Sequence, residues 1–452
     1  MNDWFDAEQR VERAQQLCES RRWEEALSEL DAALEVNPDN ATWLVNRGFL
    51  LDQLDRFDEA VAAYEAALRL EPDDRDTILC LAIALTRTGR LTSALNSLTE
   101  LAEMYPDFEP AYCYQIAAYA ELGQHDKAEE AFYLAQQIRD DCPYCYDHMG
   151  ASLAHRGEYK RAIYCWERVL QIEPMFDNIR GQMARAYRAM GDRARATEYY
   201  LSAIREDPGD VDLLHEMGLH FAEVDEWESA SRKFRQVIEL DPEHVDAYFA
   251  LVDLLLRSDD VSPVIELLEQ VRSLEPDHAK LDQRFGIAYL KAGRLNEALD
   301  HLERTLEAAP SNKAALLLCG NCLLLMHRPE AAADRFRRVI ALDATLPNAH
   351  HNLGVCCFLQ GDFELGIEHC RRAIELKPDY HTAIVKTARA YMELGRFGEA
   401  RDMIEYGLRG DPESALLRQM LEGLSRARVK YFFGRIGTLL RRLVGGASNS
   451  RS

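Results

Sequence analysis

The sequence predicts an all-α fold built as an array of helical hairpins. Ten of the fifteen prolines fall on one phase of a 34-residue period, from Pro38 to Pro412. In the same frame, alanine recurs at one fixed position in ten of twelve repeats, from Ala26 to Ala400. No segment shows the alternation of apolar and polar residues that is typical of a half-buried strand. A fixed period of this length indicates a stacked repeat protein.

Placing the periodic proline at position 32 of each repeat divides most of the chain into twelve repeats. These are residues 7–40, 41–74, 75–108, 109–142, 143–176, 177–210, 211–244, 245–278, 279–312, 313–346, 347–380 and 381–414. Repeats of this kind contact mainly their neighbours, so we expect one solenoid domain over 7–414 and not several globular domains.

Each repeat is expected to form two helices, A and B, which pack against each other. Positions 4, 7, 8 and 11 form one apolar stripe, and positions 20, 24 and 27 form the other. A small residue at position 8 and alanine at position 20 allow the helices to approach closely, and a large residue at position 24 fills the remaining space. Glycine at position 15 ends helix A in the left-handed conformation in seven repeats. Proline at position 32 ends helix B. In repeat 8, Pro263 predicts a helix B that begins late.

The charge of the chain is strongly acidic and unevenly distributed. The formal net charge is −24, but residues 415–452 carry +7, so the remainder carries −31. A basic surface is what nucleic-acid phosphates require, and we therefore expect no nucleic-acid partner.

The sequence predicts neither a signal peptide nor a membrane-spanning helix. The first ten residues lack a basic region and an apolar core, and no apolar run reaches the length of a membrane span. The eleven cysteines have no disulfide-scaffold spacing. These features predict a cytoplasmic location, and no pattern predicts an oligomeric state.

The repeat pattern resembles that of tetratricopeptide-repeat proteins over about nine-tenths of the chain. The residues that carry the resemblance in repeat 5 are Tyr146, Gly150, Gly157, Ala162 and Trp166, followed by the periodic Pro174. The resemblance implies a right-handed superhelix in which the A helices line a concave groove that holds peptides or proteins. The family's carboxylate clamp, with Lys or Arg at position 5 and Asn at position 9, is not matched, because only Asn321 fits.

Positions 2, 5, 9, 12 and 13 share the face of helix A that is turned away from helix B. We call these positions the groove stripe. In repeats 9–11 the groove stripe contains no acidic residue, and helix A of repeat 10 is apolar nearly all round. An exposed apolar patch of this kind is typical of an interaction surface. The alternative is that superhelical curvature covers these side chains. The predicted partner-binding residues are Phe249, Leu256, Lys280, Ile287, Leu290, Lys291, Leu317, Asn321, Leu324, Leu325, His351, Val355 and Phe358.

The C-terminal residues form three predicted segments. Residues 415–427 are expected to be a capping helix that covers the last apolar face. Residues 428–444 form a basic amphipathic helix, and residues 445–452 a disordered tail. The amphipathic helix has three interpretations: a second capping helix, an anchor on an anionic membrane surface, or a ligand for the groove of repeats 9–11. Its predicted contacts to an anionic surface are Arg428, Lys430, Arg435, Arg441 and Arg442.

Signals for catalysis or metal binding are weak, and we expect neither an enzyme nor a cofactor. Cys142 and Cys145 enclose Pro-Tyr, as in glutaredoxins, but without the expected βαβ context. A zinc site is the alternative to a scaffold without metal. Its four thiols would come from adjacent A helices, at Cys319, Cys322, Cys356 and Cys357. The sequence therefore predicts a non-enzymatic scaffold that binds proteins or peptides in its groove.

Overall fold

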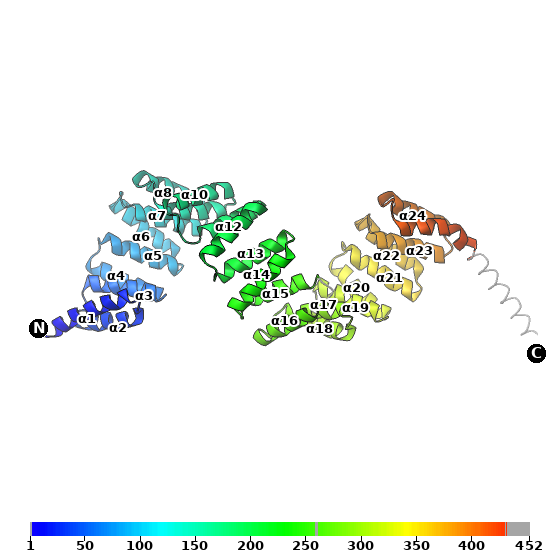
Figure 1. Ribbon diagram of the computed structural model, residues 1–452, viewed down its shortest axis with the longest axis horizontal. Coiled ribbons are helices and arrows are strands. Elements are labelled where there is room, and N and C mark those ends of the chain that lie inside the picture. Colours follow the sequence, from blue (N-terminus) through cyan, green and yellow to red (C-terminus); the bar gives the residue numbers. More distant parts are fainter. Residues whose placement is uncertain (1, 258–260, 430, 432–452) are drawn as a thin grey trace, which may run out of the picture. The chain divides into compact units, whose positions relative to one another are not determined.

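The computed structural model describes residues 2–257, 261–429 and 431, and within these residues the only regular secondary structure is helix. The chain consists of two compact parts, an N-terminal part (1–226) and a C-terminal part (227–452). In each part, helices that follow one another along the chain lie side by side (Figure 1). The predicted all-α fold of stacked helix pairs is confirmed.

The N-terminal part contains helices α1 to α13. Their bounds are α1 Asn2–Glu19, α2 Trp23–Val36, α3 Ala41–Gln53, α4 Phe57–Leu70, α5 Arg75–Arg87, α6 Leu91–Met104, α7 Glu109–Glu121, α8 His125–Ile138, α9 Pro143–His155, α10 Tyr159–Ile172, α11 Ile179–Ala189, α12 Arg193–Glu206 and α13 Val211–Glu223. Odd numbers are A helices and even numbers are B helices of the predicted repeats.

The C-terminal part continues the same alternation. Its helices are α14 Trp227–Leu240, α15 Val245–Leu255, α16 Ser262–Leu274, α17 Leu281–Lys291, α18 Leu295–Ala308, α19 Lys313–Leu325, α20 Pro329–Leu342, α21 Pro347–Gln360, α22 Phe363–Leu376, α23 His381–Glu393 and α24 Phe397–Gly410. A further helix covers residues 415–429.

The turn between helices A and B is left-handed at every position 15 that the structure describes. All seven glycines predicted there have φ between 69° and 84°. Four repeats without glycine adopt the same conformation at Arg21, Asp55, Asp225 and His327, with φ between 55° and 64°. The repeat geometry thus overrides the preference of an ordinary side chain for negative φ.

The predicted packing between helices A and B is confirmed. The ten alanines at position 20 are fully buried. A Cβ atom added to Gly150 would lie 2.6 Å from the indole Nε1 of Trp166, and one added to Gly320 would lie 2.5 Å from the ring of Phe336. Position 8 is therefore small because the large residue at position 24 of the same repeat occupies its space.

Three helices begin later than the repeat frame predicts. Helix α16 begins at Ser262, with Pro263 in its first turn, as expected. Helices α11 and α17 each begin at the third residue of their repeat, which the sequence pattern did not reveal. In front of α11, Asn178 adopts a left-handed conformation (φ 63°), and six residues connect α10 to α11.

The helix over 415–429 packs on the last two helices of the array. Leu417 is fully buried, and Met420, Leu421 and Leu424 pack against the core formed by α23 and α24. No helix within the described residues is long and apolar enough to cross a membrane. Most of the predicted amphipathic helix (428–444), including Lys430, Arg435, Arg441 and Arg442, lies outside the described residues, and so does the tail 445–452.

Candidate functional site

A cavity of about 960 Å³ opens in the N-terminal part, among helices of repeats 5, 6 and 7. It is lined by Ala151, Ala154, His155, Tyr159, Trp166, Asp177, Asn178, Gly181, Gln182, Arg185, Ala186, Ala189, Ala203, Glu206, Asp207, Asp210, Asp212 and Leu213. Eight of these residues occupy groove-stripe positions: Ala151, Ala154, His155, Asn178, Gly181, Arg185, Ala189 and Asp212. The cavity therefore includes part of the groove stripe of repeats 5–7, together with residues of α10, α12 and the connections between helices.

Two local features accompany this cavity. Helix α11 begins only at Ile179, and the left-handed Asn178 in front of it lines the cavity. The lining is also rich in residues with small side chains. These are Ala151, Ala154, Gly181, Ala186, Ala189 and Ala203. Small residues allow the backbone of a ligand to approach the A helices closely.

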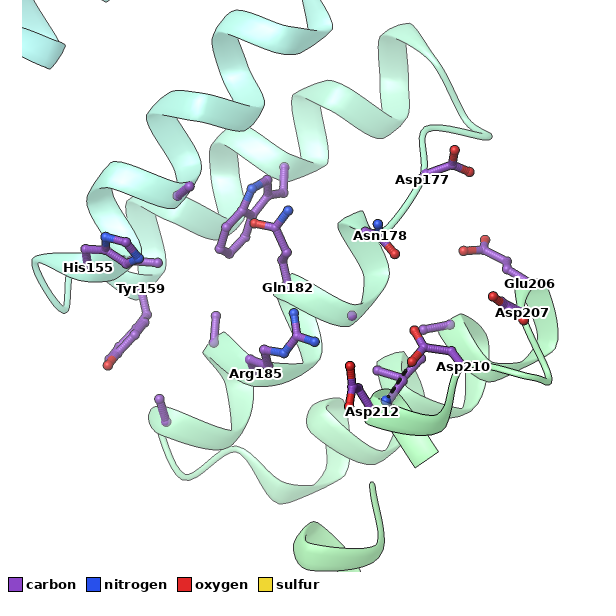
Figure 2. Close-up of a pocket in the computed structure, with 18 residues that line it drawn as sticks. His155, Tyr159, Asp177, Asn178, Gln182, Arg185, Glu206, Asp207, Asp210 and Asp212 are labelled. Atoms are coloured by element: carbon purple, nitrogen blue, oxygen red, sulfur yellow. Dashed lines mark hydrogen bonds between the residues drawn. The ribbon is translucent and has the colours of Figure 1, made fainter. Parts of the chain in front are cut away.

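The cavity has an acidic rim. Figure 2 shows Asp177, Glu206, Asp207 and Asp210 on one side, with His155 and Tyr159 on the opposite side. Five carboxylates and one guanidinium line the cavity. That guanidinium, Arg185, already donates from Nε to Oε2 of Glu216 at 2.7 Å. The electrostatic potential at the mouth of the cavity is therefore negative, which favours a cationic ligand.

Some of the rim carboxylates are engaged by the chain, and others are not. Glu206 forms an ion pair with Arg180. Asp210 caps α13 by accepting a hydrogen bond from the backbone N–H of Leu213 at 2.9 Å. Asp177 and Asp212 are exposed and form no ion pair within the part of the chain that the structure describes. These two carboxylates are the groups most available to a cationic ligand.

The floor of the cavity is fixed by a hydrogen-bonded carboxylate behind it. Oδ1 of Asp147 accepts hydrogen bonds from Nε1 of Trp166 and from Nε2 of Gln182, both at 3.2 Å. Burial raises the pKa of Asp147, while these two bonds act in the opposite direction. The side chains of α9, α10 and α11 that form the floor are thus held together by one acceptor.

The predicted groove residues of repeats 8–11 differ widely in exposure. Leu325 is 58 % exposed and, outside the predicted set, Leu359 is 60 % exposed. The two lysines, Lys280 and Lys291, are also exposed. The half-buried members are Leu256, Ile287, Leu290, Leu317, Asn321, Leu324, Val355 and Phe358.

Two of the predicted contacts are enclosed by the chain. Phe249 is buried, and its ring lies 4.6 Å from that of His278. His351 is buried against Tyr380 at 4.9 Å between ring centroids. Neither side chain can touch a ligand without moving. The apolar groove of these repeats stays a prediction for the remaining residues.

His351 predicts a loss of stability in acid. Burial, and then Lys386, lower the pKa of His351 to about 4, and its Nδ1 has no hydrogen-bond partner within the described residues. Because the folded pKa lies below the unfolded value of about 6.5, the neutral ring contributes stability above about pH 6.5. That contribution is lost as the pH falls toward 4.

We expect His351→Phe to reduce this acid sensitivity by on the order of 1–2 kcal/mol at about pH 5. Thermal unfolding of the wild-type and His351→Phe proteins at about pH 5 and pH 7 measures how much stability each protein loses in acid. The contributions of the other titrating groups are the same in both proteins and cancel in the comparison. An equal loss of stability in the two proteins would contradict the assignment to His351.

The predicted alternative zinc site of repeats 10 and 11 is wrong. Within the described residues, Cys319, Cys322, Cys356 and Cys357 do not form a group that could hold a metal ion. The buried Cys319 and Cys357 occupy apolar packing positions of their helices. The group that does converge is Glu109, Cys113, Cys142 and Cys145, of which the sequence pattern indicated only the last two.

A glutaredoxin-like role for Cys142 and Cys145 is not supported by their surroundings. Both thiols are buried, whereas a thiol that attacks a substrate disulfide needs access. Hydrogen bonds from the thiols of Cys113 and Cys145 lower the pKa of Cys142. The cause of this shift is thus the neighbouring thiols, which are buried as well.

Comparison with known proteins gives local matches. A segment of 97 residues is 35 % identical to Mitochondrial import receptor subunit TOM70 of Saccharomyces cerevisiae, which is 20 % of this chain and 16 % of that protein. A segment of 103 residues is 30 % identical to Protein STIP1 homolog of Dictyostelium discoideum, which is 23 % of this chain and 18 % of that protein. The chain thus spans about a sixth of the length of these relatives.

One solved structure with a similar arrangement is that of the APC/C hetero-tetramer Cut9-Hcn1. It has a TM-score of 0.46 and 12 % sequence identity, and the match covers 91 % of this chain and 95 % of that one.

Models of the tetratricopeptide repeat match segments in both compact parts of the chain. The matched residues are 11–75, 53–113, 180–212, 215–262, 264–322, 289–354, 347–380 and 386–405. Together they cover more than half of the sequence, and the helix pairs described above follow the same period. The chain belongs to the tetratricopeptide-repeat family.

Proposed function

We propose that this protein is a non-enzymatic scaffold that holds an extended, basic segment of a partner protein on its groove stripe. The contact is the acid-rimmed cavity formed by α9 to α13. The observation that carries the proposal is the composition of that cavity. It has a small-residue floor, five rim carboxylates, and one guanidinium that is already paired with Glu216.

The size and charge of the cavity support this ligand class. A volume of about 960 Å³ lies at the upper end of the range for ligand sites, large enough for several side chains of a peptide. Carboxylates on the rim increase the rate at which a cationic partner associates and disfavour acidic partners. Asp177 and Asp212 stand at the mouth without an ion pair in the described residues, so a lysine or arginine would meet unpaired acceptors.

A second candidate contact is the groove stripe of α17, α19 and α21. It is favoured by the exposure of Leu325 and Leu359, which are large apolar side chains on neighbouring A helices. We propose that it holds an apolar segment of a partner. For location we propose the cytoplasm, with attachment to an anionic membrane surface through residues 428–444 as the alternative.

Charge reversal at the mouth of the cavity tests the first contact. We expect Asp177→Lys with Asp212→Lys to weaken binding of a labelled arginine–glycine repeat peptide at least about tenfold, because attraction is replaced by repulsion. Fluorescence anisotropy at two salt concentrations measures the affinity, which should fall as ionic strength rises.

The matched control keeps the same charge change away from the cavity. Glu167 and Glu198 are exposed on α10 and α12 and do not line it. If Glu167→Lys with Glu198→Lys weakens the peptide equally, the binding reflects only the acidic charge of the whole chain, and the proposed site is wrong. A Leu325→Asp, Leu359→Asp variant should leave this peptide's affinity unchanged, because these residues belong to the second contact.

A further inference from the structure

Four potential metal ligands meet in the interior of the N-terminal part, outside the cavity described above. The carboxylate of Glu109 and the thiols of Cys113, Cys142 and Cys145 offer ligand atoms that all lie within 4.8 Å of one another. The four residues are 7 %, 3 %, 5 % and 2 % exposed, respectively. Cysteines that are buried merely as small apolar residues have no reason to gather around one carboxylate.

The four ligands lie at the N-terminal ends of two A helices. Glu109 is the first residue of α7, and Cys113 lies one turn further on the same face. Cys142 is the N-cap of α9, and Cys145 follows in the first turn, behind Pro143. Helices α7 and α9 pack more extensively than any other pair of consecutive A helices in the described residues. The four groups lie within that contact.

The carboxylate of Glu109 has thiols as hydrogen-bond partners and no ion-paired cation in the described residues. Its Oε1 accepts a hydrogen bond from the thiol of Cys145 at 2.8 Å, and a thiol is a weak donor. Glu109 forms no ion pair within residues 2–257, 261–429 and 431, and the nearby Arg139 binds Asp141 instead, at 2.7 Å. A buried charge of this kind is normally paired or bound to a metal ion.

We propose that Glu109, Cys113, Cys142 and Cys145 bind a structural zinc ion that joins the N-terminal turns of α7 and α9. Three thiolates and one carboxylate are ligand types that Zn²⁺ accepts in tetrahedral geometry. Four protein ligands leave no open position, which is typical of a structural site and not of a catalytic one.

Charge and proton balance are consistent with this site. Three thiolates, one carboxylate and Zn²⁺ carry a net charge of about −2, and the positive ends of two helix dipoles point toward it. Each thiol that becomes a ligand releases its proton to solvent, and the oxidation state of the metal does not change. The expected consequence is a link between consecutive repeats that packing alone does not provide.

The test is the metal content and the cobalt spectrum of the full-length chain. Protein produced in zinc-supplemented medium should contain about one zinc ion per chain by elemental mass spectrometry. After removal of the metal, titration with Co²⁺ should give thiolate charge-transfer bands and the d–d bands of a tetrahedral ion. We expect Cys113→Ser and Glu109→Gln to weaken zinc binding at least about tenfold, in a zinc-chelator competition assay.

Cys165→Ser is the matched control, because Cys165 is also buried, lies in repeat 5 and is outside the cluster. It should retain zinc and the cobalt spectrum. Glu109→Gln preserves side-chain shape, so far-UV circular dichroism of this variant separates loss of the metal from loss of the fold.

Three results would overturn the proposal. The first is a folded wild-type chain that neither contains zinc nor takes up Co²⁺. The second is a wild-type chain with the mass deficit of a Cys142–Cys145 disulfide after purification under argon. The third is equal zinc affinity in the wild-type, Cys113→Ser and Glu109→Gln proteins, which would place the metal elsewhere. None of these results bears on peptide binding at the acid-rimmed cavity.

Discussion

Replacing Phe336 by alanine is expected to lower the free energy of unfolding of the C-terminal part by about 3–5 kcal/mol. Phe336 is 0 % exposed on α20 and fills the space that Gly320 leaves on α19. The substitution removes the transfer free energy of a whole ring and leaves a cavity between two rigid helices. Hydrogen exchange measured by mass spectrometry should show loss of protection in α19 and α20 first, because repeats depend on their nearest neighbours.

The control for Phe336→Ala is Leu342→Ala, on the same helix. Leu342 is 49 % exposed, so its truncation is expected to change the free energy of unfolding by less than about 0.5–1 kcal/mol. A cost at Leu342 equal to that at Phe336 would mean that burial at position 24 does not stabilise the repeat.

Gly320→Ala is the second substitution with a large expected effect. We expect it to lower the free energy of unfolding, although helix propensity alone would predict an increase. Alanine favours a helix over glycine by roughly 1 kcal/mol. Here, however, the added Cβ would lie 2.5 Å from two ring atoms of the fully buried Phe336. Overpacking of this kind costs about 1–3 kcal/mol, so we expect net destabilisation.

Chemical denaturation of Gly320→Ala, Phe336→Ala and the double variant measures this contact directly. In the Phe336→Ala background the clash is gone, and Gly320→Ala should become neutral or stabilising. The matched control is Gly398→Ala on α24, where an added Cβ meets nothing within 4 Å, and it should stabilise by about 0.4–1 kcal/mol. Simple additivity of Gly320→Ala and Phe336→Ala would show that the two positions do not compete for space.

Sequence reasoning was most successful where one residue type recurs for one physical reason. The prolines, the alanines at position 20 and the glycines at position 15 predicted the helix pairs, their close approach and the left-handed turns. It was weaker where the backbone imposes a conformation on an unexpected residue. Asp225 and His327 adopt the same turn as glycine, although neither residue marks that position in the sequence.

The cavity lies outside the repeats in which the partner-binding residues were predicted, and the predicted groove stays a prediction. The sequence directed attention to apolar residues in repeats 8–11, and two of these, Phe249 and His351, are buried by their own neighbours. The cavity in repeats 5–7 lies beside the late start of α11 and the left-handed Asn178. Neither feature has a residue signature that a periodic pattern can detect.

The cluster of Glu109, Cys113, Cys142 and Cys145 has a sequence signal that the search for adjacent cysteines missed. Cys142 and Cys145 were conspicuous because they are close in sequence, but Glu109 and Cys113 lie about one period upstream. In a stacked repeat, residues separated by one period are neighbours in space. A search for metal ligands in such chains should therefore compare residues 30 to 36 positions apart, as roughly one period, as well as adjacent ones.

The packing of each helix on its immediate neighbours also bears on how the chain is made. A ribosome adds about 5–20 residues per second, so one repeat emerges over roughly 2–7 seconds, whereas a helical hairpin can form in microseconds. Because α1 to α6 find their packing partners within the residues already synthesised, they can bury their cores before the later repeats exist. Nascent chains of this protein should thus expose only the most recent apolar face at any time, which limits the surface that chaperones must shield.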